Sequence, residues 1–427
     1  MQLTRIRSKF ATMKKRFNIL IALSALVTIL CSCGDDRSNE FYTMTQENQW
    51  IYSTMKEVYL WSGSIGEVDQ KTFFSTPQQF FKKLLTTTDK TSFFSDATEI
   101  TNYGIKCTLL RDPLGFYPSR ISALIEYIEP NSVASAAGLQ RGMWVSEING
   151  DRLTTSSANK LMGGDEIELT IQTIEYDDEN NAYYWENHGQ ITVPAATRYN
   201  ITAVPVATTL DEITEKNGYL LINTFDGEDA VAAINNEIAT LADENINNII
   251  IDLRYNNSTS ITDAAKVAAI FIPAEKHGTN FCTLSKTLNE ENENTTAETF
   301  AIPASNVNIS NKPLYIITTA RTEGIINTFI KSIQSTRIAN DVKIIGETAK
   351  GSNFYTECYA SPYAFNINPV TAYINDAGGA PLIATLPDYA VKEYESYYPV
   401  YPLGSKQEHL LFATSYVIAN GTLPPTE

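Results

Sequence analysis

The chain has 427 residues, of which 43% are hydrophobic and 11% aromatic, and a formal net charge of −17. This length allows two or three domains, each with its own hydrophobic core, and the composition is that of an ordinary globular protein. The acidic balance disfavours nucleic acid as a partner, because a chain of this charge repels a phosphate backbone.

The start of the chain is predicted to be a targeting segment that lies outside the fold. A basic cluster at residues 14–16 precedes an apolar run over residues 17–30, which is short for a membrane-spanning helix. The run ends in Leu-Cys-Ser-Cys, a box that resembles the lipoprotein signals of bacteria, in which lipid is attached at the final Cys. This resemblance implies a signal peptide over residues 1–33 and lipid attachment at Cys33. The residues that follow are polar and predict a tether over residues 34–47 between the lipid and the fold.

The location implied by such a signal is the bacterial cell envelope, where the lipid would anchor the protein to a membrane, here the outer membrane. An ordinary secretory signal with two incidental cysteines is the alternative.

Residues 48–100 are predicted to form a small helical domain. Apolar side chains, many of them aromatic, recur there at the spacing of an amphipathic helix. The residues that carry this pattern are Trp50, Ile51, Met55, Val58, Tyr59, Leu60, Trp61, Phe73, Phe74, Phe80, Phe81 and Leu84. A packed core is favoured over an aromatic ligand surface at this spacing.

The next unit, predicted over residues 101–200, is a β domain with one short helix. Residues 121–128 alternate as a strand, an alanine-rich helix ends at Gly138, and Asn149 and Gly150 form a hairpin turn. The stretch that contains these residues resembles the EPxSxAxxAGLxxGxxVxxINGxxL sequence of PDZ domains.

PDZ domains bind an extended peptide as an added strand at the edge of a sheet, and backbone amides of a glycine-containing loop hold its terminal carboxylate. The resemblance implies that Tyr103, Gly104 and Ile105 form this loop. It also implies that the partner is a peptide or a protein C-terminus. A domain that only braces the following one is an equal alternative.

Residues 201–427 are predicted to form an α/β core domain, because apolar strands alternate with helical segments. At its centre a strand over residues 314–317 leads through a turn into a helical pattern over residues 325–333 and a second strand over residues 342–345. In open α/β sheets the chemistry lies at such a turn. Residues 283–300 are polar and acidic and are predicted to be a surface excursion.

The turns of this core resemble those of the C-terminal processing peptidases, also called tail-specific proteases, which use a Ser/Lys dyad. In that family the nucleophile turn reads roughly Thr-Ala-Ser-Ala-Ser-Glu and the base loop Gly-Glu-x-Thr-x-Gly-Lys, whereas this chain reads TEGIIN and GETAKGS. The resemblance assigns Gly324 to the nucleophile position and Ser352 to the base position. The oxyanion turn of the family ends in two glycines, and here Ser258 and Thr259 follow Asn257.

The departures at these three motifs predict that the peptidase chemistry is lost. Acyl transfer needs a nucleophile, a proton acceptor and donors to the oxyanion. The alternative is a substitute dyad of Thr322 and Lys350, each of which lies two residues before the family position. That displacement amounts to several ångströms, whereas proton transfer needs about 3 Å.

No metal or cofactor is expected, since the sequence has no CxxC motif and no cluster of cysteines and histidines. The cysteines beyond the targeting segment and the histidines are scattered: Cys107, Cys282, Cys358, His188, His277 and His409. A Ser/His/Asp triad is unsupported for the same reason.

The sequence therefore predicts a multidomain α/β protein with a small N-terminal helical domain, a PDZ-like β domain and an α/β core of the tail-specific protease (ClpP/crotonase-like) type. Its predicted function is that of an envelope pseudopeptidase that binds unstructured peptides or protein C-termini. An active serine-type peptidase with a rearranged dyad is the alternative.

Overall fold

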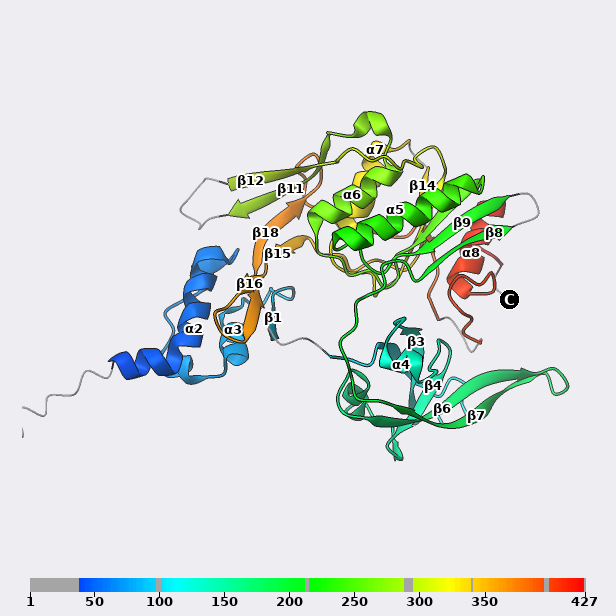
Figure 1. Cartoon of the computed structure of the whole chain (residues 1–427), viewed down its shortest axis with the longest axis horizontal. Helices are drawn as coiled ribbons and strands as arrows, with labels where there is room; N and C mark the ends of the chain where they lie inside the picture. The colour runs from blue at the N-terminus through cyan, green and yellow to red at the C-terminus, as the bar shows by residue number, and fades with distance from the viewer. Residues whose placement is uncertain are drawn as a thin grey trace, which may run out of the picture. The chain divides into compact units, whose positions relative to one another are not determined.

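The computed structural model of the chain describes residues 38–96, 101–211, 215–287, 295–338, 341–394 and 399–425 (Figure 1). The chain divides into two compact units. The first contains the described residues up to 57 and residues 65–85, and the second contains residues 58–64 and the described residues from 86 onward. The predicted signal peptide and Cys33 lie outside the described residues. Among the described helices, none is long and apolar enough to cross a membrane.

The first unit is helical. Its elements are α2 (Ser38–Val58), η2 (Gln70–Phe74) and α3 (Pro77–Leu84). Helix α3 begins after Thr76, whose Oγ1 accepts the Gln79 N–H at 3.4 Å, and Pro77 occupies its first turn. The buried apolar side chains of this unit are Ile51, Met55, Ile65, Phe80, Phe81 and Leu84.

The tether expected over residues 34–47 is wrong for residues 38–47, which form the first part of α2. This stretch contains no Gly or Pro to stop a helix. Phe41 also anchors it, because its ring packs edge to face with Phe73 and Phe74 at centroid distances of 6.3 and 5.7 Å.

The helical domain expected to reach residue 100 ends at Leu85. The next residues join the second unit, where β1 (Phe93–Asp96) pairs antiparallel with β17 (Phe365–Asn368). A partner strand more than 250 residues away leaves no local signal in the sequence around β1.

A β domain follows in the second unit. Its elements are β2 (Ile105–Arg111), β3 (Ile121–Ile128), α4 (Val133–Ala136), β4 (Trp144–Ile148), β5 (Asp151–Arg152), η3 (Ser157–Leu161), β6 (Ile167–Asp177) and β7 (Ala182–Val193). The strands pair antiparallel in the order β2-β3-β4-β6-β7, and β5 pairs with β4. Asn149 (φ 53°) and Gly150 (φ 78°) form the tight turn before β5, as predicted. Strand β2 is therefore an edge strand.

The core domain is built on a six-stranded sheet in the order β19-β14-β13-β10-β9-β8. Its strands are β8 (Val206–Asp211), β9 (Lys216–Leu221), β10 (Asn248–Asp252), β13 (Leu314–Thr318), β14 (Val342–Gly346) and β19 (Tyr389–Ala390). All pairs are parallel except the antiparallel pair of β8 and β9.

Helices cover both faces of this sheet. They are α5 (Glu228–Asp243), α6 (Ile261–Phe271), α7 (Ile326–Thr336) and α8 (His409–Asn420). Figure 1 shows α5, α6 and α7 on one face and α8 on the other. Alternation along β10 explains the two cores, because Ile249 and Ile251 pack with α5 to α7, whereas Ile250 packs with Leu410 and Leu411 of α8.

A smaller sheet in the order β12-β11-β18-β15 extends the core domain. Its strands are β11 (Asn280–Thr287), β12 (Thr295–Ala301), β15 (Phe354–Thr356) and β18 (Val370–Asn375). The surface excursion predicted over residues 283–300 is wrong for its described part, which forms the antiparallel pair of β11 and β12. The polar residues of this segment include β-branched threonines, which favour a half-exposed strand as much as a loop.

Candidate functional site

Three loops meet at the carboxyl ends of the neighbouring strands β10, β13 and β14, where an open α/β sheet places its chemistry. Main-chain hydrogen bonds join them. The Lys350 N–H donates to Thr322 O at 2.8 Å, and the Ser352 N–H donates to Gly324 O at 2.6 Å. The structure thus brings together the loops that carry all the residues predicted for the catalytic site.

The turn before α7 is also bonded to the loop after β10. The Glu323 N–H donates to Asn256 O and the Ile325 N–H donates to Ser258 O, both at 2.8 Å. These two bonds flank Gly324 on either side.

Gly324, at the predicted nucleophile position, has a left-handed backbone with φ +69°. A Cβ at this position would lie 2.0 Å from Ser258 O and 2.8 Å from the carbonyl carbon of Asn257. Both neighbours are backbone atoms, which a rotamer change cannot move. With this backbone only glycine fits, so the position has room for no side chain at all.

The backbone donors of the predicted oxyanion loop already have acceptors within the protein. The Ser258 N–H donates to Asn256 Oδ1 at 3.0 Å, while the Thr259 and Ser260 N–H groups each donate to the Asp226 carboxylate at 3.0 Å. The Ser258 side chain is buried, and its Oγ accepts a further backbone N–H at 2.7 Å. Asn257 is exposed.

The residues of the predicted substitute dyad do not form a pair. Thr322 is buried, and its Oγ1 donates to Leu253 O at 3.0 Å and accepts the Thr319 N–H at 2.9 Å. Lys350 is exposed, and within the described residues its side chain has no hydrogen bond or ion pair. Ser352, at the base position, uses its Oγ to bond the backbone of Phe354.

Two protein-family models match this chain. A model of the peptidase S41 N-terminal domain matches residues 46–95, and the model of peptidase family S41 matches residues 216–391. The chain belongs to peptidase family S41. The family and the multidomain α/β class predicted from the sequence are confirmed. The S41 match spans all three loops of the candidate site.

Solved structures agree with this family. A candidate S41 protease from Bacteroides fragilis NCTC 9343 superposes with a TM-score of 0.72 at 25% identity, covering 87% of this chain and 97% of that one. The photosystem II D1 C-terminal processing protease shares the fold, with a TM-score of 0.51 at 13% identity over 82% of this chain and 93% of that one. No curated protein matches the sequence.

A residue that the sequence did not single out connects the S41 site to the β domain. Arg321, in the turn before α7, forms an ion pair with Glu126 of β3, with Nη2 and Oε2 2.6 Å apart, and donates to Cys107 O of β2 at 2.9 Å. Burial raises the pKa of Glu126 to about 7, although the Arg321 guanidinium opposes the shift. No local pattern could reveal a contact between such distant positions.

The Cys107 carbonyl lies on the open edge of β2. Its partner in the register is Ile125, which directs both its backbone groups toward β4, accepting from Gly142 N–H at 2.9 Å and donating to Met143 O at 2.8 Å. In an antiparallel pair, Cys107 must then direct its own carbonyl away from β3. Arg321 therefore covers part of the edge at which a strand could be added.

A second contact between the two domains is a buried cluster of charges around Arg254. This side chain is fully buried and contacts Asp252 at 2.7 Å, Glu408 at 2.8 Å and Glu393 at 3.1 Å. Arg141 of the β domain reaches the same Glu393 and Glu408 at 3.3 and 3.2 Å. Two cations and three carboxylates thus form one cluster that is buried from solvent.

Glu408 has two roles in this cluster. Its carboxylate caps α8 by accepting the Leu411 N–H at 3.0 Å. Burial alone would raise its pKa, but Arg254, Arg141 and the cap lower the pKa to about 2. The stabilisation that Glu408 gives is therefore present above its ordinary pKa of 4.5 and is lost as the pH falls toward 2.

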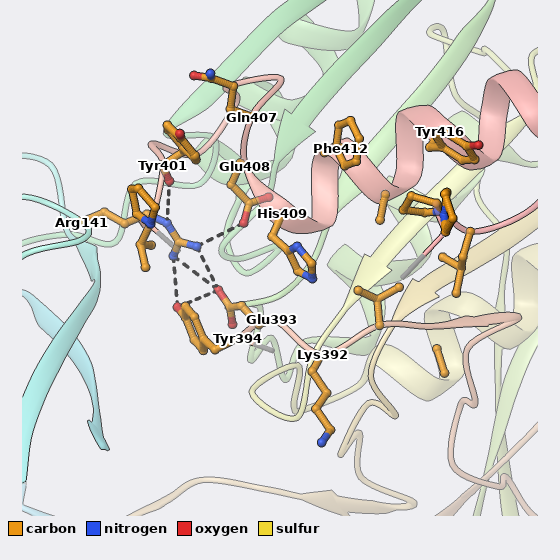
Figure 2. Close-up of a pocket in the computed structure, with 18 of the residues that line it drawn as sticks. Arg141, Lys392, Glu393, Tyr394, Tyr401, Gln407, Glu408, His409, Phe412 and Tyr416 are labelled. Carbon is orange, nitrogen blue, oxygen red and sulfur yellow. Dashed lines mark hydrogen bonds and ion pairs between the residues drawn. The ribbon is translucent and has the colours of Figure 1, made fainter. Parts of the chain in front are cut away.

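A pocket of about 1030 Å³ lies beside this cluster (Figure 2). Its walls come from α8, from residues 390–394 and 423–425, and from Tyr176 and Tyr183 of the β6–β7 ribbon. Figure 2 shows Arg141 at one end, bonded to Glu393 and Glu408. None of the residues predicted for the catalytic site lines the pocket. This pocket and the loops of the S41 site are therefore separate.

The charge cluster predicts a large effect of a small change. Replacing Glu408→Gln keeps the shape of the side chain but removes a carboxylate that two buried guanidinium groups share. We expect the free energy of unfolding, measured by urea denaturation, to fall by about 3–5 kcal/mol. The control is Glu244→Gln, which removes the half-exposed partner of Lys216 and should change little. Equal effects of the two substitutions would contradict the role given to the cluster.

The steric closure at Gly324 gives a second prediction. Gly324→Ala should lower the free energy of unfolding by about 1–3 kcal/mol more than Gly421→Ala. Gly421 has nearly the same backbone angle, φ +72°, but no atom within 4 Å of the added Cβ. The two variants share the cost of a left-handed alanine, so their difference in denaturation experiments measures the clash with Ser258 O. Equal free energies of unfolding for the two variants would show that the loop shifts to accept the added Cβ at little cost.

Proposed function

We propose that this chain is a proteolytically inactive member of the S41 family, a lipid-anchored pseudopeptidase of the bacterial envelope that binds unstructured peptides or protein C-termini. The observation that carries the inactive assignment is Gly324, where a side chain of any kind would meet Ser258 O. The lipid anchor rests on the resemblance of the first 33 residues to lipoprotein signals.

Each requirement of serine-type hydrolysis is missing from the described loops. Gly324 offers no hydroxyl, and Ser352 offers no amine and spends its Oγ on the backbone of Phe354. The amides of Ser258 and Thr259 are bonded within the protein, so they are not arranged to receive an oxyanion. Three independent losses make a return to hydrolysis by one substitution implausible.

The peptide-binding part of the proposal rests on the β domain, which we interpret as PDZ-like. Its edge strand β2 begins at Ile105, the last residue of the predicted loop Tyr103, Gly104 and Ile105. Gly104 has φ +85°, and a Cβ there would lie 2.2 Å from the Ser132 Cβ, so the loop depends on glycine. Its N–H donates to Asn102 Oδ1 at 2.8 Å. A bound carboxylate would thus have to compete with that side chain.

One observation favours the alternative, an active peptidase with a rearranged dyad. Thr322 and Lys350 are joined through their backbones at 2.8 Å, so their side chains start from neighbouring positions. Against it, the Thr322 hydroxyl gives its proton to Leu253 O, and the Lys350 side chain is exposed. A lysine base needs a desolvated environment, which an exposed ammonium lacks.

The test is a hydrolysis assay with protein that lacks residues 1–33 and an unstructured substrate such as β-casein. We expect no turnover above that of buffer, and no change in Thr322→Ala or Lys350→Ala. The double variant Gly324→Ser with Ser352→Lys should also stay inactive, because its new hydroxyl does not fit beside Ser258 O. Turnover in the unmodified chain that either alanine variant abolishes would establish the rearranged dyad instead.

Peptide binding should respond to Arg321. Replacing Arg321→Ala frees the Cys107 carbonyl on the edge of β2, and Glu126 can then take a proton because burial already raises its pKa. We expect the affinity for a fluorescent peptide with a free C-terminal carboxylate to rise about tenfold in fluorescence anisotropy. Arg111→Ala, at the exposed far end of β2, is the matched control.

The same peptide with an amidated C-terminus should bind weakly to both variants if the carboxylate is recognised. An unchanged or lower affinity of Arg321→Ala would exclude β2 as the binding edge.

A further inference from the structure

The first two turns of α2 present apolar side chains to solvent. Tyr42 is 56% exposed and Met44 is 74% exposed, and Phe74, at the end of η2, is 57% exposed. A soluble helix normally turns such residues toward a core. Together with Phe41 these three residues form what we call the N-terminal apolar patch.

The patch is continuous within the first unit. The Phe41 ring lies 5.9 Å from the ring of Tyr42 and 5.7 Å from that of Phe74, both in edge contacts. Met44 is three residues beyond Phe41 and so lies on the adjoining part of the helix surface. Behind the patch, Phe73 packs on the buried Phe80 at 4.9 Å, which makes a firm base.

The position of the patch in the chain indicates what it contacts. Residues 1–37 lie outside the described structure, and α2 begins at Ser38. The predicted lipid attachment at Cys33 is five residues earlier, so it lies within about 18 Å of Ser38 even with the chain fully extended. A bilayer that receives the lipid is therefore within reach of the first turns of α2.

The chemistry of the patch suits a bilayer surface. Tyr and Phe rings are enriched at the boundary between headgroups and acyl chains, where an apolar body and a polar tip are both accommodated. Lys71 is exposed and lies three residues before Phe74 in a 3₁₀ helix, whose side chains at this spacing eclipse each other. Its ammonium can stay among headgroups while the aromatic residues insert.

We propose that the N-terminal apolar patch inserts into the lipid surface and is a second membrane contact beside the anchor. The inference rests on the lipid anchor of the proposed function. A contact made by the folded protein adds buried apolar surface to the attachment that the lipid provides. It would also hold the first unit at the bilayer instead of leaving it on a free tether.

The experiment uses protein that lacks residues 1–33 and therefore carries no lipid. Flotation with phosphatidylcholine vesicles, and with vesicles that also contain phosphatidylglycerol, should recover the protein with the lipid. The triple variant Tyr42→Ser, Met44→Ser, Phe74→Ser should bind at least about tenfold more weakly. An unchanged urea transition would verify that this variant is folded, as expected for exposed positions.

The control is the triple variant Ile338→Ser, Ile383→Ser, Leu386→Ser, which removes side chains that are 83%, 75% and 68% exposed in the second unit. It should float like the unmodified protein. The proposal fails if the unmodified protein does not float, if the patch variant floats equally well, or if the control variant is equally impaired.

The patch proposal and the anchor proposal fail with different experimental results. The full-length chain expressed in a bacterium should carry lipid at Cys33, which mass spectrometry of the N-terminal peptide detects. A lipidated chain whose lipid-free form does not float would keep the anchor and reject the patch. A chain that carries no lipid but floats through the patch would reject the anchor. It would also reject the proposal that the patch is a second contact beside a lipid.

Discussion

Two main-chain hydrogen bonds connect two loops at the carboxyl end of the central sheet. The Glu323 N–H donates to Asn256 O, and the Ile325 N–H donates to Ser258 O. Gly324 lies between them, and its left-handed backbone leaves the carbonyl of Ser258 where a side chain would begin. The bonds involve only backbone atoms, so they do not depend on the identity of the side chains in these loops. In a serine peptidase the same place must hold an open, preorganised arrangement of nucleophile and donors. Here the Glu323 and Ile325 N–H groups bond the loop after β10, and the backbone of Gly324 leaves no room for a side chain.

Two arginine side chains near this site, one from each domain, join the β domain to the core domain. Arg321 extends from the turn to Glu126 and Cys107, and Arg141 extends from the β domain to the carboxylates around Arg254. Buried ion pairs gain little net stability, because desolvation offsets much of their attraction. Their geometry is nevertheless demanding, since an unpaired buried charge is costly. Such contacts favour one arrangement of β2 against the core, and that arrangement decides whether the edge of β2 is open.

Much of the fold could be predicted from the sequence because the signals are local. The apolar strand before the turn, the helical spacing of Ile326, Phe329, Ile330 and Ile333, and the hairpin at Asn149 and Gly150 each follow from periodicity or from a backbone preference. The errors arose where local signals were weak or misleading. The polar residues 38–47 form a helix because Phe41 packs on distant rings, and the threonine-rich segment around β11 and β12 forms a strand pair instead of a loop.

By itself, the sequence predicted the family, which the comparisons confirm, and it assigned Gly324 and Ser352 to the positions of a nucleophile and a base. Those properties follow from which side chains occupy which motif positions. Only the tertiary structure decided that Gly324 cannot carry a side chain, that the Thr322 hydroxyl is bonded away from Lys350, and that Arg321 covers the edge of β2. These facts depend on distances between atoms that are tens to hundreds of residues apart along the chain. Such distances are set by the packing of the sheet and its helices, which no local pattern encodes.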